Sequence, residues 1–296
     1  MMTKPVQGPL PNPSKPKLKA PPNSCDCHCH VFGPTDRFPY VANRQYTPPE
    51  STLEDYIKLL DRLGIDRTVL VQPSIYGTDN AAHEDAIRRL KGRARGVAVV
   101  NSNVVDKELA RLHDAGFRGV RFNLIHTGGS TSLEHLEHLA RRVAPFGWHV
   151  QLYLRGRILP DIEARLAALP TPIVIDHLGH MNAGQDIQQP GFQALLRLLD
   201  QERCWVKLCP YRFDPSGFPY ANAMPFARAL NDAAPERLVW GTDWPHPDVP
   251  GTREGENGPM PDDGALLDAL GEWFADRPTI ERILATNPAR LYGFDG

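Results

Sequence analysis

Short apolar runs alternate with amphipathic segments along most of the chain, and this alternation constrains the fold more than any other feature. Each run is rich in β-branched or apolar residues, which is typical of a buried strand, and each following segment has helical spacing. The predicted strands are 25–30, 68–72, 96–101, 119–123, 149–154, 173–177, 205–208 and 238–243. The predicted helices are 52–63, 81–90, 107–115, 132–144, 159–168, 192–201, 223–233 and 263–274, and a last helix, 279–285, leads into the C-terminal residues.

Strands that alternate with helices in this way are parallel, and we expect them to close into a (β/α)8 TIM barrel. An open doubly wound sheet is the alternative, but no Gly-rich turn of the dinucleotide-binding type follows the first strand. Ser51 and Glu54 resemble a capping box at the start of the first helix, and Gly64 follows its last turn. Residues 1–22 are rich in proline and predict an extended arm, so residues 23–296 form the predicted barrel domain.

Composition narrows the class of partner. Hydrophobic residues make up 41% and charged residues 23% of the 296 residues, as in ordinary globular proteins. The net charge of −2 would not attract nucleic acid or an anionic membrane surface electrostatically. No apolar run approaches the roughly 18 residues that span a bilayer, and the N-terminus lacks a signal-peptide core. We expect a cytoplasmic protein whose partners are small molecules or other copies of itself.

The first predicted strand interleaves cysteines with polar residues. Cys25, Cys27 and Cys29 are expected on one face of it, while Asp26, His28 and His30 share the other face. Neighbours on one strand are badly placed for disulfides, which indicates a reducing compartment. A zinc knuckle is one interpretation of the cluster, and buried thiols that pack outside a barrel strand are the other.

Polar residues follow every predicted strand. Catalytic groups of such barrels lie at the C-terminal ends of the strands. Those ends carry His28, His30, Gln72, Ser74, Thr78, Asn101, Arg121, Asn123, Tyr153, Asp176, His177, Lys207, Arg212, Asp243 and His246. An aspartate among histidines can accept a proton from water while the imidazoles polarise a carbonyl. We therefore predict a hydrolytic centre of His28, His30, His177 and Asp243.

The other histidines and the arginines receive different roles. His135 and His138 share a charged helical face and are expected in solvent, whereas His149 begins its strand and is expected to be structural. His126 and His180 are candidate substrate contacts. Guanidinium groups bind carboxylates bidentately, so Arg121 and Arg212 indicate a carboxylated substrate, the alternative being structural ion pairs.

Three motifs carry a family resemblance. Residues 26–34 read Asp Cys His Cys His Val Phe Gly Pro, residues 175–177 read Ile Asp His, and residues 240–247 read Trp Gly Thr Asp Trp Pro His Pro. Together they resemble the amidohydrolase superfamily, and more narrowly the branch that contains the 2-pyrone-4,6-dicarboxylate lactonases. The similarity extends over nearly the whole chain.

The resemblance implies a distorted barrel that hydrolyses a lactone, with Asp243 as general base. Arg121, Tyr153, Thr78, Ser74 and Arg212 fall where that family holds the carboxylates of its substrate. One position departs from the pattern, because Thr127 stands where the pyrone lactonases carry a second arginine. A muconolactone, a sugar-acid lactone or a sulfonated analogue therefore competes with the pyrone dicarboxylate as substrate.

The sequence leaves the metal content open. Many amidohydrolases hold two metal ions with a carboxylated lysine on the fourth strand and histidines on the fifth and sixth. Here Arg121 and Asn123 end the fourth strand and Tyr153 ends the fifth, so by this resemblance a binuclear centre would lack its bridging ligand. A single zinc on His28, His30, Asp243 and His177 is compatible with the residues, although metal-independent hydrolysis is favoured by the resemblance and by the nearby guanidinium groups. The main hypothesis is a lactonase of aromatic-compound catabolism. The rivals are a metal-dependent decarboxylase of an aromatic or unsaturated acid and a non-catalytic anion-binding barrel.

Overall fold

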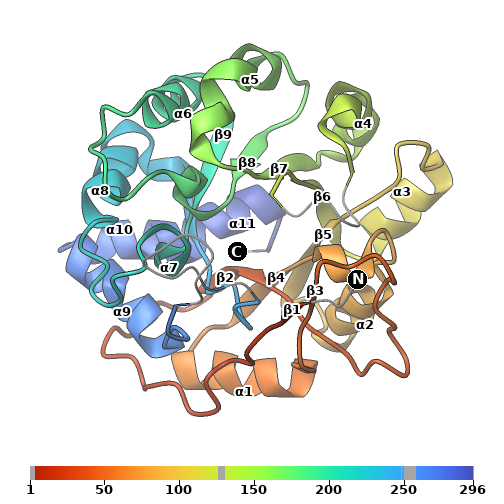
Figure 1. The fold of residues 1–296 in the computed structure, drawn as a ribbon, viewed down its shortest axis with the longest axis horizontal. Helices are drawn as coiled ribbons and strands as arrows, with labels where there is room; N and C mark the ends of the chain where they lie inside the picture. The colour runs from red at the N-terminus through yellow and green to blue at the C-terminus, as the bar shows by residue number, and fades with distance from the viewer. Residues whose placement is uncertain (1–3, 126–130, 248, 250–257, 296) are drawn as a thin grey trace.

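Eight parallel strands form the wall of a nearly closed barrel in the computed structural model, which describes residues 4–125, 131–247, 249 and 258–295 (Figure 1). The strands lie side by side in chain order, as the (β/α)8 prediction requires. They are β2 (Cys25–Cys29), β4 (Arg67–Val71), β5 (Ala94–Ala98), β6 (Phe117–Asn123), β7 (His149–Tyr153), β8 (Ile173–Ile175), β9 (Cys204–Leu208) and β10 (Leu238–Trp240).

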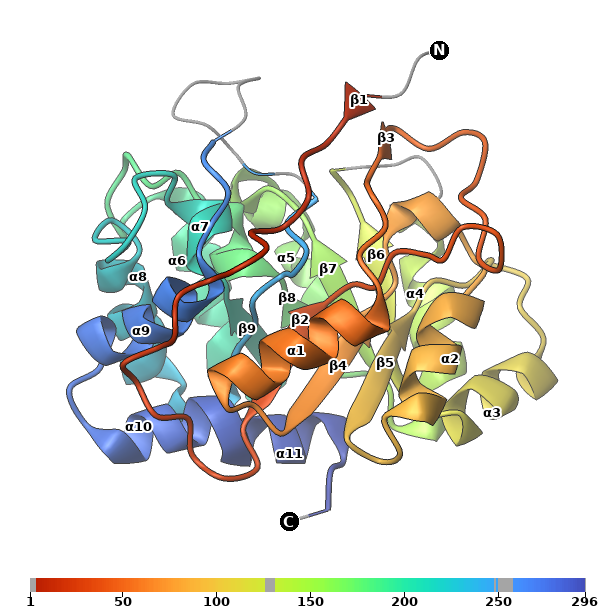
Figure 2. The same cartoon turned by 90° about the horizontal axis from the view of Figure 1, so that it is seen from below.

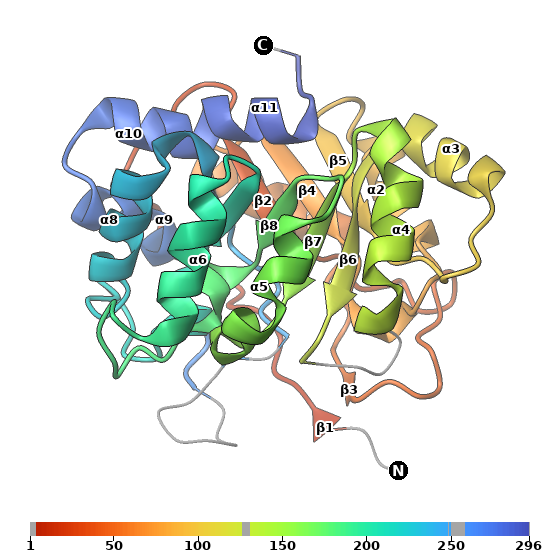
Figure 3. The ribbon, with the colours of Figure 1, turned by 90° about the horizontal axis from the view of Figure 1, so that it is seen from above.

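Helices surround this wall and bury its outer face (Figure 3). They are α1 (Leu53–Leu63), α2 (Ala81–Arg89), α3 (Asp106–Asp114), α4 (Leu136–Val143), α5 (Leu159–Ala167), α6 (Pro190–Asp200), α7 (Pro210–Phe213), α8 (Met224–Ala233), α9 (Asp263–Trp273), α10 (Arg277–Glu281) and α11 (Asn287–Tyr292). α11 crosses the end of the barrel opposite the mouth (Figure 2). Its Tyr292 is fully buried and packs with Cys25, Cys27 and Val69, which close that end of the interior.

The barrel closes between its first and last strands through the segment that follows β10. His30 N donates to Trp244 O at 2.7 Å, and Asp243 N donates to His28 O at 2.7 Å. Gly241 permits this approach, because a Cβ there would lie 2.7 Å from His28 N. The closure therefore places His28 and Asp243 side by side at the mouth.

One expectation for β2 is wrong. The register between β2 and β4 shifts between Asp26 and Cys29, so the side chains do not alternate strictly. Cys25 and Cys27 face the barrel interior, whereas Cys29 packs in the outer layer with the helices. Asp26 faces outward, where it accepts hydrogen bonds from Tyr56 Oη of α1 at 2.8 Å and from Thr242 Oγ1 at 2.6 Å. The bulge thus separates Asp26 from the two histidines.

Two helix boundaries also differ from prediction. The capping box of α1 uses Thr52 and Asp55 rather than Ser51 and Glu54, since Ser51 N donates to Phe32 O instead. The predicted helix 279–285 begins earlier as α10 and continues as a π-helical turn, Arg282–Thr286. The five cysteines are all free and buried.

The proline-rich arm runs over the surface beside α9. The backbone of Ser14 donates to the Asp262 carboxylate at 2.9 Å, and those of Lys17 and Leu18 donate to Asp268 at 2.7 and 2.8 Å. Near its start, β1 (Lys4–Pro5) pairs with β3 (Tyr46–Thr47) in a small sheet that the sequence did not predict. A domain boundary at residue 22 stays a prediction. Among the described residues, no helix has the length and apolar character needed to cross a membrane.

Candidate active site

Asp243 lies at the centre of a buried polar cluster at the C-terminal ends of the strands. It follows β10 with a positive φ of 60° and is 1% exposed. Arg212 Nε donates to its Oδ2 at 2.5 Å, and Tyr211 Oη donates to the same oxygen at 2.6 Å. Burial alone would raise the pKa of Asp243, but Arg212 and the histidines outweigh it and hold the pKa well below its usual range. Asp243 is therefore an ionised carboxylate.

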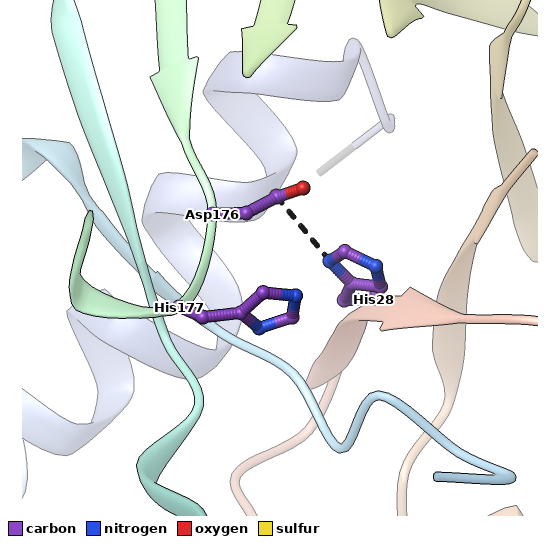
Figure 4. Close-up of side chains that lie close together, drawn as sticks. All are labelled: His28, Asp176 and His177. Carbon is purple, nitrogen blue, oxygen red and sulfur yellow. Dashed lines mark ion pairs between the residues drawn. The ribbon is translucent and has the colours of Figure 1, made fainter. Parts of the chain in front are cut away.

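The three predicted histidines converge on this carboxylate. His30 Nε2 lies 3.1 Å and His28 Nε2 lies 3.5 Å from Oδ1, while His177 Nε2 lies 3.9 Å from Oδ2. The rings of His28 and His177 are 4.6 Å apart, and Figure 4 shows them beside Asp176. Burial lowers the pKa of all three histidines, that of His28 to about 3, with Lys207 as a second cause. They are therefore neutral imidazoles at physiological pH.

The Nδ1 atoms of His28 and His30 face oxygen atoms behind the cluster. His30 Nδ1 is 2.5 Å from Val71 O, and His28 Nδ1 is 3.3 Å from Asp176 Oδ1 (Figure 4). Such partners set the orientation of each ring and direct both Nε2 atoms toward Asp243.

A second buried layer below the histidines was not assigned a role from the sequence. Lys207 is fully buried, with Nζ 2.8 Å from Gln151 Oε1, 3.4 Å from His28 Nδ1 and 3.5 Å from Asp176 Oδ1. Gln151 Nε2 donates to Asp176 Oδ2 at 3.1 Å. The strand-end rule marked Asp176 and Lys207 as polar, but only the closed barrel brings them under His28.

The two arginines flank Tyr153. The guanidinium of Arg121 lies 5.5 Å and that of Arg212 lies 5.8 Å from the centre of its ring. Arg121 Nη1 donates to Gln72 O at 3.0 Å, and its Nη2 is 3.6 Å from Asp176 Oδ2. Both arginines thus lie in ion pairs with buried aspartates and also beside the site.

The remaining predicted substrate contacts are more scattered. Ser74 is buried, and its side chain interacts with that of Tyr46. The sequence analysis did not identify Tyr46, which also interacts electrostatically with Arg121 and Arg212. Thr78 is exposed, and its hydroxyl accepts from Asn101 Nδ2 at 3.4 Å. In the described part of the chain, Thr78 makes no contact with the central cluster.

The other histidines occupy varied positions. His180 Nε2 is 3.4 Å from Tyr153 Oη, so it borders the site. His149 is buried beside Tyr292, which fits its predicted structural role. His138 is exposed and His135 is partly exposed. Thr127 and His126 lie outside the described residues.

The cluster fits one divalent metal ion. Ligand atoms of His28, His30 and Asp243 lie within 4.8 Å of one another, and so do those of His177, Cys209 and Asp243. Histidines whose Nδ1 faces an oxygen and whose Nε2 faces a carboxylate are typical of metal ligands. Among the described residues, Cys25, Cys27 and Cys29 belong to no such group, which disfavours the zinc-knuckle interpretation.

Comparison with known proteins identifies the family. An amidohydrolase family model matches residues 25–294. The chain belongs to the amidohydrolase family. This amidohydrolase is 38% identical over 292 residues to the 2-pyrone-4,6-dicarboxylate hydrolase of Comamonas testosteroni, with 95% of this chain and 93% of that protein covered. It is also 38% identical over 292 residues to the 4-sulfomuconolactone hydrolase of Rhizobium radiobacter, with 98% and 96% covered.

A solved structure extends the likeness to the fold. The Acinetobacter baumannii protein described as a probable 2-pyrone-4,6-dicarboxylic acid hydrolase, crystallised with citric acid bound, has a TM-score of 0.78 and 29% identity. The comparison covers 92% of this chain and all (100%) of that one. The predicted barrel and the predicted family of this amidohydrolase are therefore confirmed, as is its nature as an enzyme.

Proposed function

We propose that this amidohydrolase opens a small carboxylated lactone by attack of water, with Asp243 as the general base. The observation that carries the proposal is the buried carboxylate of Asp243, which lies 3.1 to 3.9 Å from imidazole nitrogens of His28, His30 and His177 and contacts the guanidinium group of Arg212. A carboxylate can take a proton from water, and neutral imidazoles can donate N–H groups to an oxygen that gains charge.

The reaction has two steps. Asp243 accepts a proton as the water oxygen bonds to the lactone carbonyl carbon, and the carbonyl oxygen becomes an oxyanion held by N–H donors of His28 and His177. The carbonyl then re-forms, the ring C–O bond breaks, and Asp243 returns its proton to the leaving oxygen. One water is consumed, and the product carries a new hydroxyl or enol and a new carboxylic acid that ionises in solution.

The arginines suggest the class of lactone. Arg121 and Arg212 flank Tyr153 at the mouth, and guanidinium groups favour carboxylates or sulfonates. The named substrates of the two lactone hydrolases carry such groups, and the related crystal structure holds citric acid. We therefore infer a pyrone dicarboxylate, a sulfonated muconolactone or a similar anionic lactone from aromatic-compound breakdown.

A metal ion is compatible with this proposal but no step depends on one. His28, His30 and Asp243 would hold it, with His177 beside them, and a bound ion would act as a Lewis acid on the lactone carbonyl. Elemental analysis of the purified protein, with activity measured before and after chelation, decides whether one contributes.

Replacing the base tests the proposal. Asp243→Asn should lower kcat for 2-pyrone-4,6-dicarboxylate or 4-sulfomuconolactone by about 10²–10⁴-fold, which is the contribution of a general base. The assay follows loss of lactone absorbance and the gain of one water in the product mass. Asp61→Asn, on the exposed face of α1, is the matched control. A loss of less than tenfold in Asp243→Asn would rule out this role for Asp243.

A metal-dependent decarboxylase is the second candidate, because the same side chains fit a divalent ion. It predicts release of carbon dioxide and sensitivity to chelators. Affinity for anionic lactones without any product would instead indicate a non-catalytic binding barrel. A cytoplasmic location and a homo-oligomeric state remain proposals, which cell fractionation and light scattering can test.

A further inference from the structure

The ring of His28 has one proton, and the groups around the ring decide which nitrogen carries it. His28 is fully buried and neutral, so the proton is on either Nδ1 or Nε2. Nε2 lies 3.5 Å from Asp243 Oδ1, and among the described residues it has no hydrogen-bond partner. Only a proton on Nε2 therefore allows His28 to donate a hydrogen bond to a substrate oxygen beside Asp243.

Two charged side chains compete for Nδ1 on the other side of the ring. Lys207 Nζ lies 3.4 Å from Nδ1, and Asp176 Oδ1 lies 3.3 Å from it (Figure 4). An ammonium group only donates, so it can bond to Nδ1 only if that nitrogen carries the lone pair. A carboxylate only accepts, so it requires the proton on Nδ1. The two neighbours therefore favour opposite positions of the proton.

Gln151 holds both competitors in place. Its Oε1 accepts from Lys207 Nζ at 2.8 Å, and its Nε2 donates to Asp176 Oδ2 at 3.1 Å. The amide cannot be reversed, because a reversed amide would place donor against donor at Lys207 and acceptor against acceptor at Asp176. Arg121 Nη2 also lies 3.6 Å from Asp176 Oδ2. The carboxylate of Asp176 thus has two partners on Oδ2 and does not depend on a proton from His28.

The charge of Asp243 decides between the two positions. A proton on Nε2 points an N–H toward Asp243 and a lone pair toward Lys207, and only the contact with Asp176 is unfavourable. A proton on Nδ1 suits Asp176, but it opposes the ammonium of Lys207 and leaves a lone pair against the Asp243 carboxylate. Two of the three contacts favour Nε2, and in a buried site each of them is weakly screened.

His30 has the opposite arrangement. Its Nδ1 is 2.5 Å from Val71 O, which only accepts, so the proton of neutral His30 is on Nδ1 and Nε2 carries the lone pair. His28 is thus the member of this histidine pair that can donate from Nε2 into the site.

We propose that Lys207 is a positioning residue that holds the proton of His28 on Nε2 by donating a hydrogen bond to Nδ1. The consequence for catalysis rests on the proposed lactone hydrolysis: His28 Nε2–H donates to the oxyanion that forms when water attacks the carbonyl. Lys207 acts through His28 and transfers no proton itself. Without Lys207 the proton is free to move to Nδ1, where Asp176 accepts a hydrogen bond from it, and Nε2 then presents a lone pair to the oxyanion.

Nitrogen NMR of ¹⁵N-labelled, chelator-treated protein tests the position of the proton directly. A ring nitrogen that carries a proton and one that carries a lone pair have well-separated chemical shifts, and the His28 signals are identified by their absence in His28→Gln. In wild-type protein we expect the proton on Nε2 of His28 and on Nδ1 of His30. A proton on Nδ1 of His28 would overturn the proposal, and this measurement needs no variant of Lys207.

Lys207→Met tests the cause. The His28 proton should move to Nδ1, and kcat for an anionic lactone should fall about 10²–10³-fold with little change in KM, which is the effect of losing one oxyanion donor. Val206→Ala is the matched control for lost stability, because it removes buried methyl groups from the outer side of the same strand, β9. It should keep the proton on Nε2 and the wild-type kcat. A proton that stays on Nε2 in Lys207→Met, or an equal loss of kcat in Val206→Ala, would overturn the role of Lys207.

The two measurements separate this inference from the proposed function. If wild-type protein opens no lactone, the proposed function fails, while the spectra still decide which nitrogen of His28 carries the proton. If wild-type protein opens a lactone and Asp243→Asn does not, but Lys207→Met keeps the wild-type kcat, the proposed function stands and the role of Lys207 fails.

Discussion

Removal of the Lys207 ammonium group should destabilise the barrel strongly. Lys207 is fully buried, and its Nζ lies 3.5 Å from Asp176 Oδ1 and 2.8 Å from Gln151 Oε1. Loss of one partner from a buried ion pair costs about 3–5 kcal/mol, because the other charge stays buried without compensation. Arg121 Nη2 lies 3.6 Å from Asp176 Oδ2 and still offsets part of that charge. We therefore expect Lys207→Met to lower the free energy of unfolding by about 3 kcal/mol.

Urea unfolding followed by tryptophan fluorescence measures this loss. Lys58→Met is the matched control: Lys58 pairs with Asp55 on the surface at 3.0 Å, and an exposed pair contributes about 0–1 kcal/mol. The double variant Lys207→Met with Asp176→Asn removes both charges, and it should recover about 2 kcal/mol relative to the sum of the single changes. If Lys207→Met costs no more than Lys58→Met, the buried pair does not stabilise the barrel as argued.

Two further predictions concern acid stability and the barrel closure. Burial lowers the pKa of His149 from 6.5 to about 3, so the unfolded chain binds a proton that the folded chain does not, and stability is lost as pH falls from 6.5 to 3. The loss is about 1.4 kcal/mol per pH unit, so His149→Leu should show a shallower decline of unfolding free energy than wild type over that range; equal slopes would contradict it. Gly241→Ala should cost about 1–3 kcal/mol by overpacking and should slow lactone turnover, because its Cβ would lie 2.7 Å from His28 N. Gly271→Ala in α9, whose Cβ meets only Leu18 at 3.9 Å, should instead stabilise by up to about 1 kcal/mol; a similar loss in both variants would show that the contact with His28 is not the cause.

The barrel could be predicted because its signal is local and repeated. An apolar run buried on both faces, followed by an amphipathic segment, identifies each strand and helix without knowledge of its neighbours. The C-terminal ends of all strands lie at the same end of such a barrel. Because His28, His30, His177 and Asp243 were each placed at a strand end, this rule alone predicts that they lie together. Their separations of 3.1 to 3.9 Å agree with that rule.

The details that escaped prediction depend on contacts between distant segments. The bulge in β2 arises where that strand must pair with β4 and also meet the segment after β10, and period-two alternation contains no signal for it. Tyr46 interacts with Ser74 from the two-residue strand β3, and the sequence around it shows no periodicity that would predict a strand. The sequence indicated that Arg212 binds a carboxylate, but it could not show that Asp243 already supplies one.

Backbone strain at the site supports a preorganised centre. His177, Asp243 and His246 adopt positive φ values of 52°, 60° and 61°, a region that non-glycine residues enter at a cost of about 1–3 kcal/mol each. Surrounding contacts must hold them there, and His246 provides two: its Nε2 lies 3.1 Å from Asp263 Oδ1, and its backbone N donates to Asp243 O at 2.9 Å. These contacts fix the turn at the end of β10, and with it the position of Asp243, before substrate arrives.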